Sequence, residues 1–261
     1  MKEHVWIESR NKRLSAMLHL PESFKQGMPL VVCCHGFTGN KVGYNHLTLN
    51  LAVSLENSGY GALRFDFLGS GDSDGDFSTD TVVSGWQQDL INVLHWVESQ
   101  EQFSNSPIIL YGHSLGGLIV LTYKDLNKRL AGRIVFAPVT SPIENFKDVI
   151  LKEELWSKSL AGEKVENFFD KAFTLESQFV QDLVSNQYEP ISDIREVKAP
   201  LLVIHGQKDA VVPISGSQKL FDAYQGIKEF AVTEFDHGAL GAQKELQSII
   251  SSWLERHQAL W

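Results

Sequence analysis

Short apolar runs alternate along the chain with segments in which apolar residues recur at helical spacing. Residues 30–34 are all apolar, which suits a strand that is buried on both faces of a sheet. The first two runs are short and alternate between apolar and polar residues, as expected for an antiparallel pair. The predicted strands are residues 5–8, 14–20, 30–34, 62–66, 107–111, 133–137, 201–204 and 229–232.

Helical periodicity fills the gaps between most of these runs. The predicted helices include residues 47–55, 82–97, 118–126, 220–224 and 246–254. A Gly-, Ser- and Asp-rich segment at 68–76 is typical of a loop instead. Because parallel strands need crossover connections, the alternation predicts an α/β protein with a mostly parallel, eight-stranded sheet and helices on both of its faces.

The alternation breaks between residues 139 and 189, where the pattern predicts helices and no strand. One helical face is marked by residues 143–150 and another by residues 165–173. A segment of about fifty residues is too long to be a structureless loop. We therefore expect a core made of residues 1–138 and 190–261, with residues 139–189 as a helical cap over one end of the sheet.

Composition narrows the class of protein. The chain of 261 residues is 43% hydrophobic and 21% charged, as is typical of soluble globular proteins. Its formal net charge of -9 would repel a nucleic acid, and no Lys/Arg run offsets it, so no nucleic-acid partner is expected. With no signal-peptide pattern and no apolar stretch near the ~18 residues of a membrane span, we expect a cytoplasmic protein without a membrane partner. The neighbours Cys33 and Cys34 point to opposite faces of a strand, so no disulfide is expected between them.

The strand at 107–111 leads directly into Gly112-His113-Ser114-Leu115-Gly116, and a helical pattern follows. A nucleophilic serine needs a sharp turn that projects its hydroxyl, and glycines two residues to either side let the strand and helix pass closely. The helix N-terminus also points its N–H groups toward the place where an oxyanion would develop. The alternative is a segment that merely caps a helix, but the strand–turn–helix context favours Ser114 as a nucleophile.

A neutral serine hydroxyl needs a base, and His237 is the best placed of the nine histidines. It follows the last predicted strand, at the carboxyl edge of the sheet, where ligands bind in such folds. Asp209 follows the strand at 201–204 at the same edge and is the expected acid that orients His237. Asp236 is a rival, but adjacent side chains diverge on an extended backbone. The alternatives are a surface histidine at 237 and a capping aspartate at 209.

An acyl-transfer site also needs two fixed N–H donors for the oxyanion. We expect one from Leu115, directly after the nucleophile, and one from Phe37 in the loop His35-Gly36-Phe37-Thr38-Gly39. The alternative for this loop is a glycine-rich turn without a ligand. His35 is expected to support the loop by hydrogen bonding. Structural roles are expected for His4, His19, His95 and His257.

Five motifs occur in the order seen in α/β-hydrolases: His35-Gly36-Phe37-Thr38-Gly39-Asn40-Lys41, Phe65-Asp66 with Gly69-Ser70-Gly71-Asp72-Ser73-Asp74-Gly75, Gly112-His113-Ser114-Leu115-Gly116-Gly117, His205-Gly206 with Asp209 and Val212-Pro213, and His237-Gly238. The chain thus resembles that superfamily, and most of all the bacterial cinnamoyl and feruloyl esterases and small carboxylesterases. The resemblance covers nearly all of the chain except the cap. It implies that Ser114 is the nucleophile, His237 the base and Asp209 the orienting acid, with Phe37 and Leu115 as the oxyanion donors.

The resemblance also implies that Asp66 is buried and hydrogen-bonded rather than catalytic. In these esterases, polar cap residues bind the phenolic hydroxyls of the acyl group, but no residue of this cap can be aligned with them. The aromatic residues Trp156, Phe168, Phe169 and Phe173 could line an acyl pocket, although packing onto the core is the expected role of most.

These features predict a serine carboxylesterase that hydrolyses small to medium acyl esters or cinnamoyl-like aromatic-acid esters through an acyl-enzyme. No metal and no organic cofactor is expected, and the expected partner is a small-molecule ester. The same triad would also serve a peptidase, a thioesterase or a carbon–carbon hydrolase. A non-enzymatic ligand-binding member is a further alternative, and the oligomeric state, monomer or homodimer, stays open.

Overall fold

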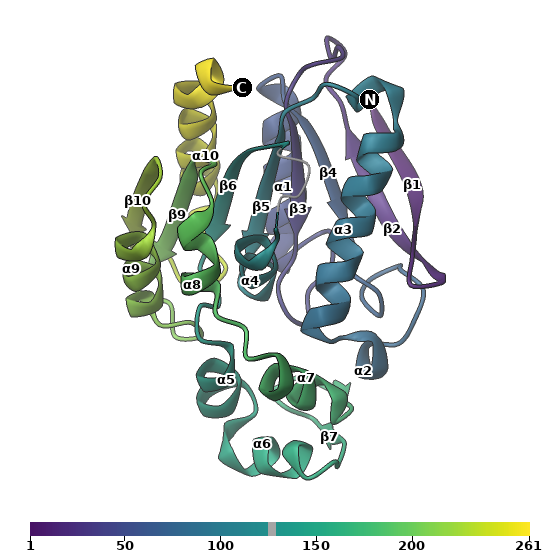
Figure 1. The fold of residues 1–261 in the computed structure, drawn as a ribbon, viewed down its shortest axis with the longest axis vertical. Helices are drawn as coiled ribbons and strands as arrows, with labels where there is room; N and C mark the ends of the chain where they lie inside the picture. The colour runs from purple at the N-terminus through teal and green to yellow at the C-terminus, as the bar shows by residue number, and fades with distance from the viewer. Residues whose placement is uncertain (125–128) are drawn as a thin grey trace.

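The computed structural model describes residues 1–124 and 129–261 (Figure 1). The strands are β1 (Lys2–Ser9), β2 (Lys12–His19), β3 (Leu30–Cys34), β4 (Gly61–Phe65), β5 (Ile108–His113), β6 (Leu130–Phe136), β7 (Val165–Glu166), β8 (Thr174–Leu175), β9 (Leu201–Gly206) and β10 (Lys228–Thr233). The α-helices are α1 (Leu47–Asn57), α2 (Phe77–Asp80), α3 (Val83–Ser99), α4 (Leu115–Thr122), α5 (Pro142–Asn145), α6 (Lys152–Leu160), α7 (Gln178–Asn186), α8 (Pro190–Asp193), α9 (Ile214–Ala223) and α10 (Gln243–His257). Shorter helical turns are η1 (Tyr44–His46), η2 (Glu101–Phe103), η3 (Phe146–Ile150, of π type), η4 (Ile194–Glu196) and η5 (Gln258–Leu260).

Eight strands form one sheet in the order β1-β2-β4-β3-β5-β6-β9-β10, which confirms the predicted eight-stranded sheet. β2 is antiparallel to both β1 and β4. All the other neighbours in the sheet pair in parallel. The loops that leave the parallel strands at their carboxyl ends therefore gather at one edge of the sheet.

Helices cover both faces of this sheet (Figure 1). On one face, α1 and α10 pack over Val31 and Cys33 of β3; on the other, α3 and α4 pack over Val32 and Cys34. Alternate residues of one strand thus enter two separate hydrophobic clusters, as the period of two requires. The two cysteines are free thiols, in line with the sequence prediction. Within the described part of the chain, every helix is too short or too polar to cross a bilayer.

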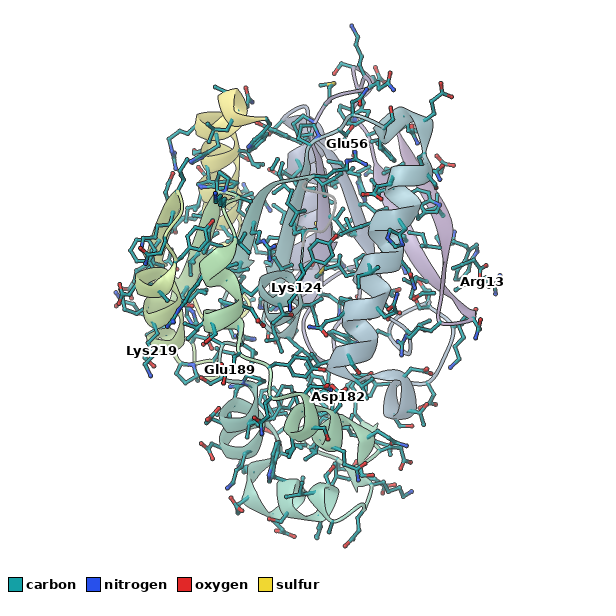
Figure 2. The ribbon with its side chains drawn as sticks, viewed as in Figure 1. Arg13, Glu56, Lys124, Asp182, Glu189 and Lys219 are labelled. Carbon is teal, nitrogen blue, oxygen red and sulfur yellow. The ribbon has the colours of Figure 1, made fainter. Side chains whose placement is uncertain are left out.

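Residues 139–189, all of which are described, contribute no strand to the eight-stranded sheet. They form α5, η3, α6, β7, β8 and α7, and Figure 1 shows these elements together at the lower end of the view. Figure 2 labels Asp182 of α7. This residue connects the segment to the core, because its carboxylate accepts hydrogen bonds from the N–H and the hydroxyl of Ser84 in α3. Tyr188 donates to the same carboxylate at 2.9 Å.

Two predictions of local structure need correction or restriction. The helical face predicted at 165–173 is wrong, and so is the absence of strands from 139–189, because β7 and β8 pair as a short antiparallel ribbon. The turn between them has positive φ at Asn167, Phe169 and Asp170, a conformation that asparagine and aspartate tolerate and that no helix contains. The helix predicted at 118–126 is observed as α4, which ends at Thr122; residues 125 and 126 lie outside the described residues.

Candidate active site

Ser114 occupies the turn that joins β5 to α4. Its φ of 56° and ψ of -119° lie in a region that residues with a side chain rarely adopt, so this turn is strained, as the motif predicts. A Cβ on Gly116 would lie 2.4 Å from the carbonyl oxygen of Cys34, and a Cβ on Gly112 would lie 2.4 Å from the carbonyl oxygen of Gly116. Both positions therefore require glycine, because the backbones of the strand, the turn and the helix lie too close together for a side chain.

The loops after β9 and β10 bring Asp209 and His237 together. These two strands pair in parallel along their whole length, so their loops leave the sheet side by side. His237 Nδ1 donates a hydrogen bond of 2.8 Å to Asp209 Oδ2. The rival acid Asp236 instead accepts bonds from the backbone N–H groups of Gly238 and Leu240. Of the two candidate acids, the structure pairs Asp209 with the histidine.

The Asp209 carboxylate is held by several donors at once. Its Oδ1 accepts the backbone N–H groups of Val211 and Val212 at 2.8 and 2.9 Å, and its Oδ2 also lies 3.3 Å from His205 Nε2. Burial raises the pKa of Asp209, but the hydrogen bonds from His205, His237 and the backbone outweigh burial and bring the pKa well below its usual value. The carboxylate is therefore ionised at neutral pH and keeps the proton of His237 on Nδ1.

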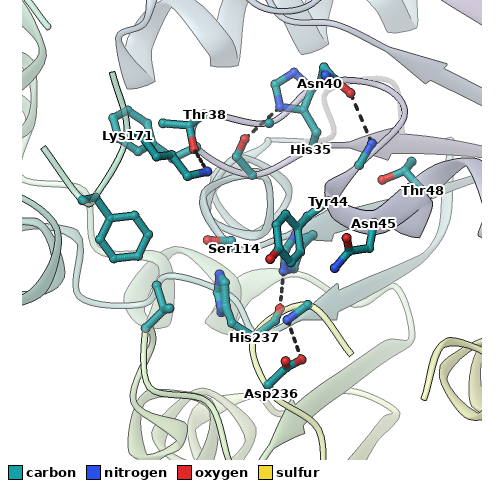
Figure 3. A pocket seen from close by; sticks show the side chains of 18 of the residues that line it. His35, Thr38, Asn40, Tyr44, Asn45, Thr48, Ser114, Lys171, Asp236 and His237 are labelled. Atoms are coloured by element: carbon teal, nitrogen blue, oxygen red, sulfur yellow. Dashed lines mark hydrogen bonds between the residues drawn. The ribbon is translucent and has the colours of Figure 1, made fainter. Parts of the chain in front are cut away.

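Ser114 and His237 line the same cavity, and Figure 3 shows their side chains near each other. Among the described residues, no hydrogen bond joins Ser114 Oγ to the His237 ring. His113 lies beside them: its Nε2 donates to the carbonyl oxygen of His237 at 2.7 Å, and the two ring centroids are 4.8 Å apart. Burial, together with the neighbouring His237, lowers the pKa of His113 to about 3. His113 is therefore a neutral support for the loop that carries His237.

The loop after β3 passes directly against the serine turn. A Cβ on Gly36 would lie 3.0 Å from Ser114 Cβ, so only glycine lets the loop approach this closely. In the part of the chain that the structure describes, neither Phe37 N–H nor Leu115 N–H donates to another protein group. The structure thus brings the two predicted donors to the serine turn with their N–H groups free.

The Phe37 ring packs among aromatic side chains of residues 139–189. Its centroid lies 4.9 Å from that of Phe146, 5.2 Å from that of Phe179 and 5.8 Å from that of Phe168. These three phenylalanines are themselves buried. The loop that bears the first predicted oxyanion donor is therefore held in place partly by side chains of residues 139–189.

A cavity of about 610 Å³ lies over Ser114, within the usual size range of small-molecule sites. Of the four aromatic residues considered for an acyl pocket, Phe169 lines this cavity. Trp156 and Phe168 are buried in the core, and Phe173 packs on Phe77 with ring centroids 4.5 Å apart. The expectation that most of them serve packing is correct.

Sequence reasoning missed several polar residues of the cavity wall (Figure 3). They are Thr38, Asn40, Tyr44, Asn45, Thr48, Lys171 and Lys208. The first five lie in or shortly after the loop that bears Phe37, so their proximity to that motif was an available signal. Lys171 had no such signal, because it lies in the turn between β7 and β8, far from every motif, and only the fold brings it to the cavity.

The structure also tests the supporting residues. His35 Nδ1 donates to the carbonyl oxygen of Gly36 at 2.9 Å and its Nε2 accepts from Phe67 N–H at 3.2 Å, so His35 supports the loop as predicted. Asp66 is fully buried and accepts both the backbone N–H and the ammonium of Lys41, as predicted. The four histidines expected to be structural lie outside the cavity wall. Within residues 1–124 and 129–261, no three His, Cys, Asp or Glu side chains are placed to hold a metal ion.

The strand order, the strained serine turn and the Asp209–His237 pair define a serine hydrolase of the α/β-hydrolase class. The chain belongs to the family described as serine aminopeptidase, S33, which matches residues 26–171, more than half of its length. The α/β-hydrolase resemblance found in the sequence is thereby confirmed.

Three known proteins illustrate what the chain is similar to. An Escherichia coli protein described as an uncharacterized 31.7 kDa protein in the traX-finO intergenic region is 28% identical over 77% of this chain and 80% of its own length. The lysophosphatidylserine lipase ABHD12 of Xenopus tropicalis is 25% identical over 84% of this chain, which spans about half (52%) of that lipase. The structure of Est1E from Butyrivibrio proteoclasticus with ferulic acid bound has a TM-score of 0.85, at 20% identity, over 98% of this chain and 99% of Est1E. That structural likeness concerns the fold.

Proposed function

We propose that this enzyme is a carboxylesterase that acts on small to medium acyl esters or aromatic-acid esters. One observation carries the proposal: His237 Nδ1 donates to the ionised Asp209 at 2.8 Å, in a cavity that also contains Ser114 on its strained turn. This arrangement fixes the tautomer of His237. With the proton held on Nδ1, the lone pair of Nε2 is available to accept a proton from a nucleophile.

In the proposed mechanism, Ser114 Oγ attacks the carbonyl carbon of the ester while its proton passes to His237 Nε2. The carbonyl oxygen becomes an oxyanion, which the free N–H groups of Phe37 and Leu115 stabilise. Nε2 then returns the proton to the departing alcohol as the carbon–oxygen bond breaks, leaving an acyl group on Ser114. A water molecule repeats the sequence on the acyl-enzyme, releasing the acid and restoring Ser114. No step calls on a metal or an organic cofactor.

We further propose that residues 139–189 act as a cap that forms part of the acyl site. Ile150, Phe169 and Lys171 extend from this segment into the wall of the cavity. The Phe37 contacts with Phe146 and Phe179 connect the same segment to the oxyanion loop. The ferulic acid bound by Est1E, which shares this fold, supports including aromatic acids in the candidate substrates.

The charges of the cavity wall argue against an aminopeptidase, the activity in the family description. Such an enzyme must bind a substrate ammonium, which a free carboxylate would do best. Among the described residues of the wall, Asp236 is the one carboxylate, and its Oδ1 already accepts two backbone N–H groups. Lys171, which has no carboxylate partner among the described residues, contributes a positive charge that would repel the ammonium.

The test compares four substrate classes with the wild type and with Ser114→Ala. We expect turnover of 4-nitrophenyl esters of two to eight carbons and of methyl ferulate, and much lower turnover of aminoacyl-4-nitroanilides and acyl-CoA thioesters. Ser114→Ala should abolish ester hydrolysis while circular dichroism stays unchanged. Ser58→Ala, on an exposed serine at the end of α1, is the matched control and should keep full activity.

A fluorophosphonate probe distinguishes an inactive ligand-binding protein from an enzyme whose substrate is absent from the panel. We expect the probe to label the wild type and the Ser58→Ala variant and to leave Ser114→Ala unlabelled. Ester hydrolysis retained by Ser114→Ala would rule out the proposed nucleophile. A wild type that neither binds the probe nor cleaves any substrate would point to a non-enzymatic member.

A further inference from the structure

Lys171 is a cation inside the cavity that no element of the proposed ester mechanism requires. It lies in the turn between β7 and β8, and its ammonium donates a 2.9 Å hydrogen bond to Thr38 Oγ1. Thr38 directly follows Phe37, so the ammonium is held beside the oxyanion loop (Figure 3). The cap segment thus places one positive charge close to the site where an ester carbonyl would bind.

The ammonium of Lys171 has no acidic partner among the described residues. Thr38 Oγ1 is the one acceptor within hydrogen-bond distance of Nζ, and an ammonium has three N–H bonds to donate. Burial lowers the pKa of Lys171, with no nearby carboxylate to oppose the shift. By contrast, Lys208 on the same wall has its ammonium 3.3 Å from the Glu234 carboxylate and is mostly exposed.

A half-buried, unpaired ammonium costs free energy that a bound anion would recover. The one carboxylate of the described wall, that of Asp236, already accepts two backbone N–H groups and does not contact Lys171. The other lysine of the wall, Lys208, already has a carboxylate partner in Glu234. This local positive charge occurs in a chain with a formal net charge of -9, so it is not part of a generally basic surface. The missing partner is therefore best supplied by the substrate.

We propose that Lys171 selects esters that carry a carboxylate group, which its ammonium binds beside Thr38. This inference rests on the proposed esterase function and narrows its substrate class. One ammonium and one hydroxyl match a single negative charge, whereas a phosphate ester with up to two charges is usually bound by several cations or a bidentate arginine. The carboxylate can belong to the acyl group or to the alcohol, and the experiment separates these two positions.

The experiment compares charged and neutral substrates of equal size. The acyl-side pair is 4-nitrophenyl hydrogen adipate and 4-nitrophenyl adipamate, and the alcohol-side pair is the butyrate esters of 4-hydroxybenzoate and 4-hydroxybenzamide. For each pair the measured quantity is the ratio of kcat/KM for the carboxylate to kcat/KM for the amide. The proteins are the wild type, Lys171→Met, Lys171→Arg and, as the matched control, Lys208→Met.

In at least one pair we expect the wild type to prefer the carboxylate, and Lys171→Met to lower that ratio about tenfold or more, the scale of a hydrogen bond to a charged group. Lys171→Arg should retain most of the preference, Lys208→Met should change the ratio less than about twofold, and added salt should weaken the preference. The pair that responds identifies the side of the ester that carries the charge.

An unchanged ratio in Lys171→Met, for both pairs and with the amides still hydrolysed, would overturn this inference and leave the esterase intact. An equal loss of preference in Lys208→Met would also overturn it, because general steering by surface charge would then suffice. If the wild type hydrolyses neither member of either pair, the esterase proposal itself fails, and the inference fails with it.

Discussion

The imidazole of His205 lies with Nε2 3.3 Å from Oδ2 of Asp209, the oxygen that also accepts the bond from His237. The same Nε2 is 3.0 Å from the carbonyl oxygen of Val212, and a carbonyl can only accept, so Nε2 carries the proton. Nδ1 then accepts a 2.7 Å bond from the Ser217 hydroxyl. The fully buried His205 therefore donates toward Asp209 and helps to hold this carboxylate in place, so it is a positioning residue for the proposed acid.

We predict that His205→Phe, which keeps a ring but removes the N–H donor, lowers kcat by roughly tenfold with little change in KM. Losing a donor also raises the pKa of Asp209, so the loss of activity that protonation of this carboxylate causes in acid should begin at a higher pH than in the wild type. His205→Asn, which can restore an N–H, should recover part of both effects. A purely structural role would instead lower the fraction of folded protein and leave the pH profile of the active fraction unchanged.

Backbone strain at Ser114 predicts an unusual order of stabilities. At φ of 56° and ψ of -119°, glycine is relaxed whereas alanine keeps the strain. Ser114→Gly should therefore have a free energy of unfolding about 1–2 kcal/mol higher than Ser114→Ala, although both variants should be inactive. Urea denaturation measures the difference. At Ser58, where φ is -89°, the glycine variant should be no more stable than the alanine variant, and a similar gain there would refute the strain argument.

His113 predicts a pH dependence of stability. Its pKa is lowered to about 3 by burial and by His237, whereas an unfolded histidine titrates near ~6.5. Between these values the unfolded chain binds a proton that the folded protein does not, so His113 lowers stability as the pH falls from ~6.5 toward 3. At pH 4.5 this penalty amounts to about 2–3 kcal/mol relative to pH 7.

His113→Gln removes this titration and keeps a hydrogen-bond donor. Its free energy of unfolding should consequently fall less steeply with acid than that of the wild type, by the same 2–3 kcal/mol at pH 4.5. Denaturant titrations at pH 7.0, 5.5 and 4.5 give the two slopes. His95→Gln, at an exposed position of α3, should keep the wild-type slope. Parallel slopes for His113→Gln and the wild type would contradict the assignment.

Two carboxylates bind the same ammonium in very different surroundings. Lys41 Nζ lies 2.5 Å from Asp66, which is fully buried, and 2.6 Å from Asp72, whose side chain is 79% exposed. Asp66→Asn leaves a buried cation without its main partner and should cost about 3–5 kcal/mol of stability. Asp72→Asn should cost less than about 1 kcal/mol. If thermal or urea unfolding gave equal losses of stability for the two variants, burial would not determine how much each ion pair contributes.

The local patterns were sufficient to predict the eight-stranded sheet and to propose Ser114, Asp209 and His237 as a triad, of which the structure pairs Asp209 with His237. Strands such as residues 30–34 can be predicted because a strand that is buried on both faces is made almost entirely of apolar residues. The motif around Ser114 can be recognised in the sequence because its turn requires glycine at positions 112 and 116. A Cβ at either position would lie 2.4 Å from a backbone carbonyl oxygen. The pattern at 165–173 misled, since apolar spacing of helical type also arises when an irregular turn packs its side chains into a core.

By itself, the sequence determined the class of chemistry, because a nucleophile, its acid and its base each sit in a motif set by local backbone geometry. Only the tertiary structure decided which side chains contact one another at the carboxyl edge of the sheet. It paired Asp209 rather than Asp236 with His237, added His205 and His113 as supports, and carried Lys171 to Thr38. These contacts join residues that are far apart in the sequence, so no local pattern encodes them. They depend on the register of the sheet and on the packing of residues 139–189, which together bring separate loops to one place.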